Sequence, residues 1–460
     1  GPMGVYWVFF KFYDLLARFS CPPSHIMGKK QMLRLFPQLD ERIKYACVFY
    51  EGQHDDARTN LSIALTAAEH GAVIANHAEV TKLLKNSEIS DGSPGEGVPD
   101  NSRDSAVITG AEIRCRISGE SLRVRAKSVV MCGGPFTDWL REKEANDTKI
   151  TPVVNGAAGS HIVLPGYLCP SDTGMVDMAT SDGRILFYLP WEGHTLVGTT
   201  DVKCSITDRP IPTEEEIKWI IDETNNYLSP QCQVTRKDVL SAWSGIRPLA
   251  GDPHAAPGAP ASRDHVVSVN PTTKVVFVAG GKWTTYREMA EDAIDRLLET
   301  HPSLSTTAGP CKTLSVDLLG AEGYDRNLAV SLAKKHGLSI EVGARLARCY
   351  GGRAVDVCHV FEEIPQYKGP IVDGYPYLLA EIPYACREQA RTIEDILSRR
   401  TRLSYLNLDA AYRAIPVVAE VMADTLGWSA SETSRQIKEA ESFLETFAGP
   451  EPAAALKAGN

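Results

Sequence analysis

The chain has 460 residues, of which 43% are hydrophobic and 23% are charged, and its formal net charge is -10. This length and composition predict two or three soluble domains with hydrophobic cores. The negative charge and the lack of a dense basic segment argue against a nucleic-acid partner. The 11 cysteines include no CxxC pair, so the sequence predicts no disulfide framework and no metal site, and favours a reducing compartment.

The first helical segment, residues 5–19, is rich in aromatic residues. It is too short to span a bilayer, and it is interrupted by Lys11, Asp14 and Arg18. The pattern favours a core or cap helix within residues 1–50. Docking onto a membrane surface is the alternative, which the aromatic residues support.

Residues 51–150 predict an α/β region. A helix from Asp55 stops at His70-Gly71, and the apolar run 72–75 predicts a strand that ends near Val80. The polar segment 86–104 predicts a surface loop. Next come a β-hairpin, predicted by the alternation over residues 112–126, and a short strand, 128–132, which ends on a glycine turn.

Residues 151–270 predict antiparallel strands at 160–164, 184–191 and 194–200, the last two joined as a hairpin. Thr213 and Glu216 predict a capping box that starts an amphipathic helix. A further hairpin is expected from residues 265–269 and 274–279. After about Leu319 the strand signal ends and helical periodicity continues to Phe447, which predicts an α/β body followed by an all-α domain.

The strand 276–279 breaks on Gly280-Gly281 and is followed by Lys282 and a predicted helix. Glycines let the backbone approach a ligand, threonine hydroxyls can cap the helix, and the helix N-terminus attracts electron-rich groups. The segment therefore predicts an anion or cofactor site, with a tight turn and a solvated lysine as the alternative. A P-loop is excluded, because Val276 and Trp283 stand where its first glycine and its Ser or Thr belong.

Four residues carry the candidate chemistry. Arg247, Arg263 and Lys282 would bind a phosphate-bearing substrate if they converge, because guanidinium groups bind such dianions with paired hydrogen bonds. His161 would then accept a hydroxyl proton while hydride leaves the adjacent carbon. A structural histidine and surface arginines are the alternative interpretation.

Six motifs follow one another along nearly the whole chain, at residues 52–58, 159–163, 198–201, 243–249, 280–287 and 398–403. In this order they resemble FAD-dependent glycerol-3-phosphate dehydrogenase of the mitochondrial type. The resemblance implies oxidation of sn-glycerol 3-phosphate to dihydroxyacetone phosphate, with FAD as cofactor and a quinone as electron acceptor. It also implies a peripheral position on the mitochondrial inner membrane and allows a homodimer.

The same resemblance implies the fold and its divisions. An FAD-binding body of the D-amino-acid-oxidase type would comprise residues 51–150 and 271–310. Residues 151–270 would form an antiparallel β substrate cap, and residues 311–460 a helical C-terminal domain.

The resemblance also assigns roles to individual residues. It implies catalytic roles for His161, Arg247 and Lys282, and substrate binding by Arg263 and Thr199. The residues that it implies for FAD contact are Val80, Gly133, Gly134, Pro135, Gly281, Lys282, Trp283 and Thr284.

One element of the family pattern is missing from these 460 residues. Dinucleotide sites carry a GxGxxG turn between a strand and a helix, and the nearest cluster, Gly92, Gly95 and Gly97, has the wrong spacing. The resemblance begins at about Val5, so we expect the first nucleotide-binding unit to be absent. Three explanations fit: a truncated sequence, a unit supplied by another chain, or a non-catalytic homologue that acts as a structural or interaction subunit.

Overall fold

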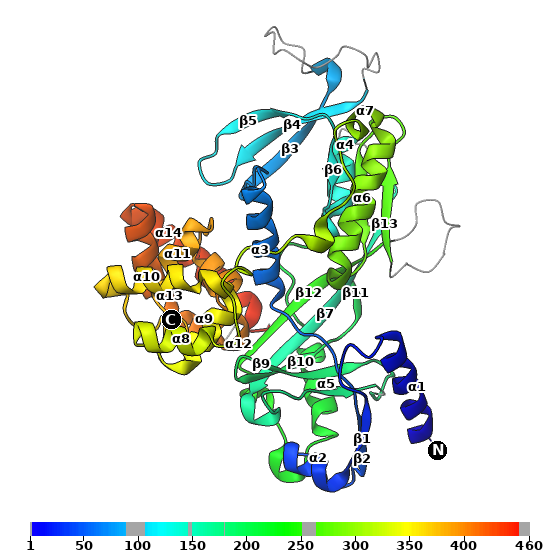
Figure 1. Ribbon diagram of the computed structural model, residues 1–460, viewed down its shortest axis with the longest axis vertical. Helices are drawn as coiled ribbons and strands as arrows, with labels where there is room; N and C mark the ends of the chain where they lie inside the picture. The colour runs from blue at the N-terminus through cyan, green and yellow to red at the C-terminus, as the bar shows by residue number, and fades with distance from the viewer. Residues whose placement is uncertain (1, 89–105, 146–149, 179, 251–263, 450–460) are drawn as a thin grey trace.

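The computed structural model describes residues 2–88, 106–145, 150–178, 180–250 and 264–449 (Figure 1). Three regions are visible in Figure 1: an upper α/β body, a lower β-rich cap, and a helical domain on the left. Strands β7 and β12 run between the body and the cap. The mixed α/β body followed by an all-α domain agrees with the fold class predicted from the sequence.

The body is built around a small mixed sheet. Its central strand, β14 (Val276–Gly280), pairs in parallel with β6 (Val130–Met131) and antiparallel with β13 (His265–Val269). The core beneath it joins Met131 and Phe277 to side chains of a second, antiparallel sheet. That sheet consists of β3 (Ala78–Lys85), β4 (Ile108–Cys115) and β5 (Ser121–Arg125), and the body helices are α3 (Asp56–Glu69), α4 (Thr137–Glu144), α6 (Tyr286–Thr300) and α7 (Pro302–Ser305).

The cap is a six-stranded antiparallel sheet in which β7 (Val154–Pro165) pairs with three other strands. The remaining strands are β8 (Met175–Asp177), β9 (Leu186–Trp191), β10 (His194–Gly198), β11 (Val202–Cys204) and β12 (Ser241–Ala250). The predicted β9–β10 hairpin is confirmed, since His194 lies opposite Trp191. Helix α5 (Glu214–Asn225) begins with the predicted capping box and buries Ile217 and Ile220 against the sheet.

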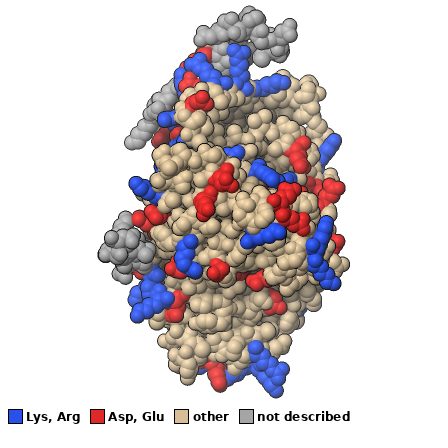
Figure 2. All heavy atoms as spheres, turned by 90° about the vertical axis from the view of Figure 1, so that its left-hand side faces the viewer, with Lys and Arg blue, Asp and Glu red and all other residues tan. Residues whose placement is uncertain are grey.

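The prediction that helices replace strands after about residue 319 is confirmed by the helical domain. Its helices are α8 (Leu328–His336), α9 (Ile340–Tyr350), α10 (Ala354–Glu363), α11 (Glu381–Arg387), α12 (Leu403–Leu406), α13 (Leu408–Leu426) and α14 (Ala430–Leu444). They enclose the largest hydrophobic cluster of the described residues, and Trp191 and Trp243 of the cap pack against it. The cap sheet and the helical domain therefore pack against each other. On the face seen in Figure 2, basic and acidic side chains are interspersed.

Of the two interpretations of residues 5–19, the core helix is wrong, and the cap helix stays a prediction. Helix α1 (Pro2–Leu16) exposes apolar residues along most of its length, among them Trp7, Phe9, Phe12 and Leu16, whereas Phe10 is buried. Phe10 stacks on Phe49, just after β2 (Tyr45–Val48), which pairs with β1 (His25–Gly28) beside α2 (Lys29–Leu35). Within the described part of the chain, no helix combines the length and the apolarity that crossing a bilayer requires.

The strand predicted at residues 72–75 is also wrong. These residues form no strand and are exposed, and Val73 is 95% exposed. An apolar run forms a strand only where a neighbour accepts its backbone hydrogen bonds, and no described strand lies beside this one. Strand β3 begins at Ala78, so Val80 lies inside a strand and not at its end. Of the polar segment 86–104, residues 89–104 lie outside the described residues.

Candidate active site

The pairing of β7 with β10 and β12 builds one half of the candidate site. In this register His161 lies opposite Gly198 on one side and opposite Trp243 on the other. The imidazole stacks on the Trp243 indole with the ring centroids 5.1 Å apart and the planes 9° from parallel. A side chain at position 198 would overlap the imidazole, so only glycine gives this ring its place.

The His161 ring is held as a neutral base. Its Nδ1 atom is buried and has no hydrogen-bond partner in the described structure. Burial, together with the positive charge of Arg247, lowers the pKa of His161 from 6.5 to about 4. An unpartnered ring nitrogen of this kind can accept a hydrogen bond or a proton from a ligand.

Arg247 lies close to this histidine, on β12. Its guanidinium donates to Thr199 Oγ1 at 3.1 Å and to the Thr200 carbonyl at 3.2 Å, and it lies 3.4 Å from a carboxylate oxygen of Asp201. Gly159 makes room for it, since a Cβ there would lie 2.7 Å from both terminal nitrogens. The side chain is 38% exposed, so part of the guanidinium remains open to an anion.

The other half of the candidate site lies where two parallel strands end. Because β6 and β14 run in parallel, with Phe277 opposite Met131, the turns that follow them lie at the same edge of the sheet. Both turns use left-handed backbone that favours glycine, with φ of 53° at Gly134, 72° at Gly280 and 82° at Gly281. Crevices at the carboxyl ends of parallel strands are the usual ligand sites of such sheets.

The segment after Gly281 differs from the predicted capped helix. Lys282 precedes a 3₁₀ turn, Trp283–Thr285, and only then does α6 begin. The Thr285 hydroxyl donates to the Lys282 carbonyl and caps no amide, so the predicted threonine cap is wrong. Lys282 is exposed, and the indole nitrogen of Trp283 is buried without a hydrogen-bond partner in the described structure.

The two halves are connected through β12. Its last residue, Ala250, packs with Val154 and Ala279, and its Cβ lies 3.0 Å from the position a Cβ would take at Gly280. Arg247 is three residues back along the strand, which corresponds to about 10 Å. The structure thus brings His161, Arg247 and Thr199 together, but shows no bond from Lys282 to any of them. Arg263 lies outside the described residues.

Sequence reasoning missed several residues that shape this site. Trp243 stacks on the His161 imidazole, and the absence of a side chain at Gly198 and Gly159 leaves room for His161 and Arg247. The motif at 52–58 places His54 beside Trp283, with ring centroids 6.2 Å apart, and Asp55 in an ion pair with Arg402. Three of the recognised motifs, 52–58, 280–287 and 398–403, therefore meet in space. The sequence signal that could have pointed to Trp243 was its place in the 243–249 motif, two residues before Gly245.

A sheet whose parallel strand ends carry glycine turns, joined to an antiparallel cap that holds a neutral histidine and an arginine, is an arrangement that suits a cofactor-dependent oxidoreductase. The comparisons with known proteins agree with this class. Residues 4–287 match the family of FAD dependent oxidoreductases, and residues 311–433 match the C-terminal domain of alpha-glycerophosphate oxidase.

The chain is 41% identical over 445 residues to the mitochondrial glycerol-3-phosphate dehydrogenase of Mus musculus, covering 95% of this chain and 59% of that protein. It is 37% identical to the probable mitochondrial enzyme of Dictyostelium discoideum, covering 96% of this chain and 68% of that one. The chain thus spans about three fifths of the first of these relatives and about two thirds of the second.

A solved structure is also similar. The glycerol-3-phosphate dehydrogenase of Bacillus halodurans complexed with FAD aligns with a TM-score of 0.76 and 27% identity, over 93% of this chain and 80% of that one. The chain belongs to the FAD-dependent oxidoreductase family and, within it, to the mitochondrial-type glycerol-3-phosphate dehydrogenases.

Proposed function

We propose that this chain catalyses the FAD-dependent oxidation of sn-glycerol 3-phosphate to dihydroxyacetone phosphate. The observation that carries the proposal is that a buried, neutral His161 on β7 and a partly open Arg247 on the adjacent strand β12 lie near enough for the Arg247 charge to lower the pKa of the imidazole. A base and a cation at this spacing suit a substrate that has a hydroxyl group and a phosphate group. The family of the chain supports the same substrate.

The residues present fit the ring end of FAD. Gly133, Gly134 and Pro135 follow β6, and Gly281 to Thr284 follow β14, so two backbone turns lie at the same edge of the sheet, and the buried Trp283 indole nitrogen has no protein partner among the described residues. Val80 contributes to the core under this sheet. The GxGxxG turn that binds the pyrophosphate is not found in these 460 residues. When bound, the flavin supplies the hydride acceptor.

The protein residues then have separate tasks. Arg247 binds the substrate phosphate, with Thr199 orienting the guanidinium, and the neutral His161 imidazole accepts the hydroxyl proton. Phosphate binding offsets the positive charge of Arg247, which raises the pKa of His161 toward the neutral range where a general base is effective. The family resemblance assigns substrate contacts to Lys282 and Arg263 as well, and both side chains are cationic.

The proposal includes the setting of the reaction. Electrons pass to a quinone, and the protein lies peripherally on the mitochondrial inner membrane, where it can form a homodimer. The mitochondrial names of the relatives support this location. The exposed apolar surface of α1, which includes Phe9 and Phe12, supports membrane contact, because such a surface gains free energy on leaving water.

The purified chain provides the test. We expect a flavin absorbance spectrum that bleaches when glycerol 3-phosphate is added under anaerobic conditions. A folded protein that stays colourless after incubation with FAD would contradict the proposal for this chain alone.

A substitution tests the phosphate contact. Arg247→Ala should weaken binding of a phosphate-bearing substrate analogue by about 10- to 100-fold, since it removes charge-assisted hydrogen bonds worth about 1.5–3 kcal/mol. Arg209→Ala is the control, because Arg209 is also an exposed cap arginine but bonds to Ser442 of α14. Calorimetry should show unchanged affinity for the control. Equal affinities for both variants would remove Arg247 from the site.

A further inference from the structure

A row of aromatic rings connects the helical domain to the His161 imidazole. The imidazole stacks on Trp243, and the Trp243 indole meets the ring of Tyr405 edge to face, with the centroids 5.1 Å apart and the planes at 82°. Behind Tyr405, Phe447 makes a second edge-to-face contact at 5.0 Å. Tyr405 lies on α12, and Phe447 ends the 3₁₀ turn that follows α14. Two elements of the helical domain therefore support the tryptophan on which the imidazole stacks.

Two hydrogen bonds fix this part of the helical domain against β12, the strand that carries the tryptophan. The Ser241 hydroxyl donates to the Ser404 carbonyl at 3.1 Å, and the Leu408 amide donates to the Leu240 carbonyl at 3.0 Å. Each of these four residues lies within three positions of the tyrosine or of the tryptophan in the sequence. The tyrosine ring is therefore presented to the indole from a fixed backbone.

Trp191 of β9 completes the aromatic cluster. Its ring centroid lies 5.8 Å from that of Trp243 and 6.0 Å from that of Tyr405. The next residue, Glu192, accepts a hydrogen bond from the hydroxyl of Tyr377, which is 1% exposed and belongs to the core of the helical domain. Rings packed at interior density have little room to turn. The place of Tyr405 therefore determines how the Trp243 indole lies.

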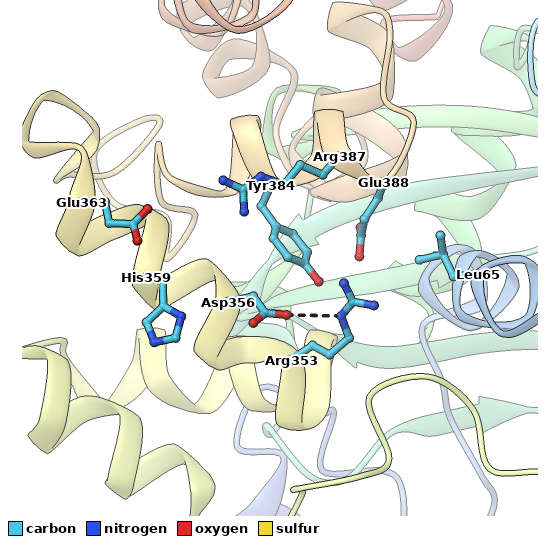
Figure 3. Close-up of a pocket in the computed structure, with 8 residues that line it drawn as sticks. All are labelled: Leu65, Arg353, Asp356, His359, Glu363, Tyr384, Arg387 and Glu388. Carbon is cyan, nitrogen blue, oxygen red and sulfur yellow. Dashed lines mark ion pairs between the residues drawn. The ribbon is translucent and has the colours of Figure 1, made fainter. Parts of the chain in front are cut away.

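The contact between the helical domain and the body is of a different kind. It includes a polar cavity of about 240 Å³, lined from α3, α10 and α11, in which Arg353 pairs with Asp356 (Figure 3). Three carboxylates and two arginines line this cavity, so charges of both signs are present. Side chains beside a cavity have room to change rotamer, whereas close-packed rings do not. Of these two contacts, the aromatic contact with the cap is the one that suits the positioning of a side chain.

We propose that Tyr405 is a positioning residue for the proposed reaction, and that through Trp243 it holds the His161 imidazole in its place opposite Gly198. This role rests on the proposed function, in which His161 is the base. Tyr405 acts through the tryptophan, because its ring meets the indole and the indole covers the imidazole. Without the tyrosine ring the indole has room to tilt, and water then reaches the imidazole. The helical domain thereby keeps the base away from water.

NMR titration of His161 tests this role. The full chain is labelled at the histidine Cε1 carbon, and the His161 signal is identified by its loss in His161→Asn. In the wild type the pKa of His161 should be about 4. Tyr405→Leu should raise this pKa by about one pH unit or more, because burial is the largest cause of the lowered value and the charge of Arg247 is unchanged. The titration needs no FAD or substrate, so its outcome is independent of the flavin test of the proposed function.

Three further variants make the result specific. Tyr405→Phe keeps the ring and should restore the wild-type pKa of His161. Tyr405→Met keeps most of the side-chain volume without the ring, and it replaces the leucine variant if that protein does not fold. Tyr367→Leu is the matched control, because it makes the same exchange in the same hydrophobic cluster, where Tyr367 bonds to Asp424 of α13.

The control should leave the pKa of His161 unchanged. The proposal is overturned if this pKa stays near 4 when Tyr405 is replaced by leucine or methionine. It is also overturned if Tyr367→Leu raises the pKa as much as Tyr405→Leu does, since the effect would then be a general loosening of the helical domain.

Discussion

At the scale of single residues, His161 should make the stability of the protein depend on pH. Its pKa is about 4 in the folded protein and about 6.5 in the unfolded chain. The unfolded chain therefore binds the proton first as the pH falls, and the free energy of unfolding should decrease between about pH 6.5 and 4. The full difference corresponds to about 3 kcal/mol.

Urea unfolding of the wild type and of His161→Asn from pH 8 to 4 measures this contribution. Other titrating groups act equally on both proteins, so the difference between the two curves isolates His161. We expect the difference in free energy of unfolding between the wild type and His161→Asn to shrink as the pH falls from about 6.5 to 4, and to stay constant below about pH 4. Parallel curves would mean that the imidazole is not held neutral.

Sequence reasoning identified His161 and Arg247, but not the surroundings that give them their properties. Neither residue is unusual in isolation. What makes the pair a candidate site is a register that sets Gly198 and Trp243 on either side of the imidazole, with Gly159 under the guanidinium. That register joins strands about 40 and 80 residues apart in sequence, and local pattern carries little information about such pairing.

At the scale of elements, the exposed aromatic residues of α1 predict that this helix binds to lipid vesicles. Phe9 and Phe12 are 52% and 58% exposed on a helix whose anchor, Phe10, is buried. The double variant Phe9→Ser, Phe12→Ser should bind phosphatidylcholine vesicles about 10-fold more weakly in a sedimentation assay, since each exposed ring gains free energy on entering the interface.

The control replaces Trp139, an exposed aromatic of α4 with 47% exposure. Trp139→Ser should not change vesicle binding if α1 is the docking element. Equal losses for α1 and α4 variants would indicate non-specific adsorption of exposed aromatic side chains.

The elements that the sequence predicted correctly are those with local determinants. The α5 capping box and the β9–β10 turn at Glu192-Gly193 are specified by adjacent residues, and both form as expected. The prediction of a strand at residues 72–75 was wrong because a strand needs a neighbouring strand to pair with, and local sequence does not show whether one is present. The sequence likewise could not show that α1 is exposed, since a helix rich in aromatic residues has the same sequence pattern in a core and on a surface.

At the scale of the whole molecule, ion pairs connect the body to the helical domain. Arg58 of α3 bonds to Glu388, just after α11, and Asp55 pairs with Arg402. The Arg58 and Glu388 side chains are only 12% and 6% exposed. The Asp55–Arg402 pair joins the 52–58 and 398–403 motifs, which lie more than 300 residues apart in the sequence.

Breaking the Arg58–Glu388 pair should therefore weaken the attachment of the helical domain. Glu388→Gln leaves the Arg58 guanidinium buried without its counter-charge, which should cost about 3 kcal/mol in the free energy of unfolding. Glu439→Gln removes an exposed partner of Arg435 and should cost less than about 1 kcal/mol. Urea unfolding followed by tryptophan fluorescence compares the two. If Glu388→Gln costs no more than the control, the buried pair does not hold the helical domain, and the apolar packing of Trp191 and Trp243 of the cap against that domain is the stronger attachment.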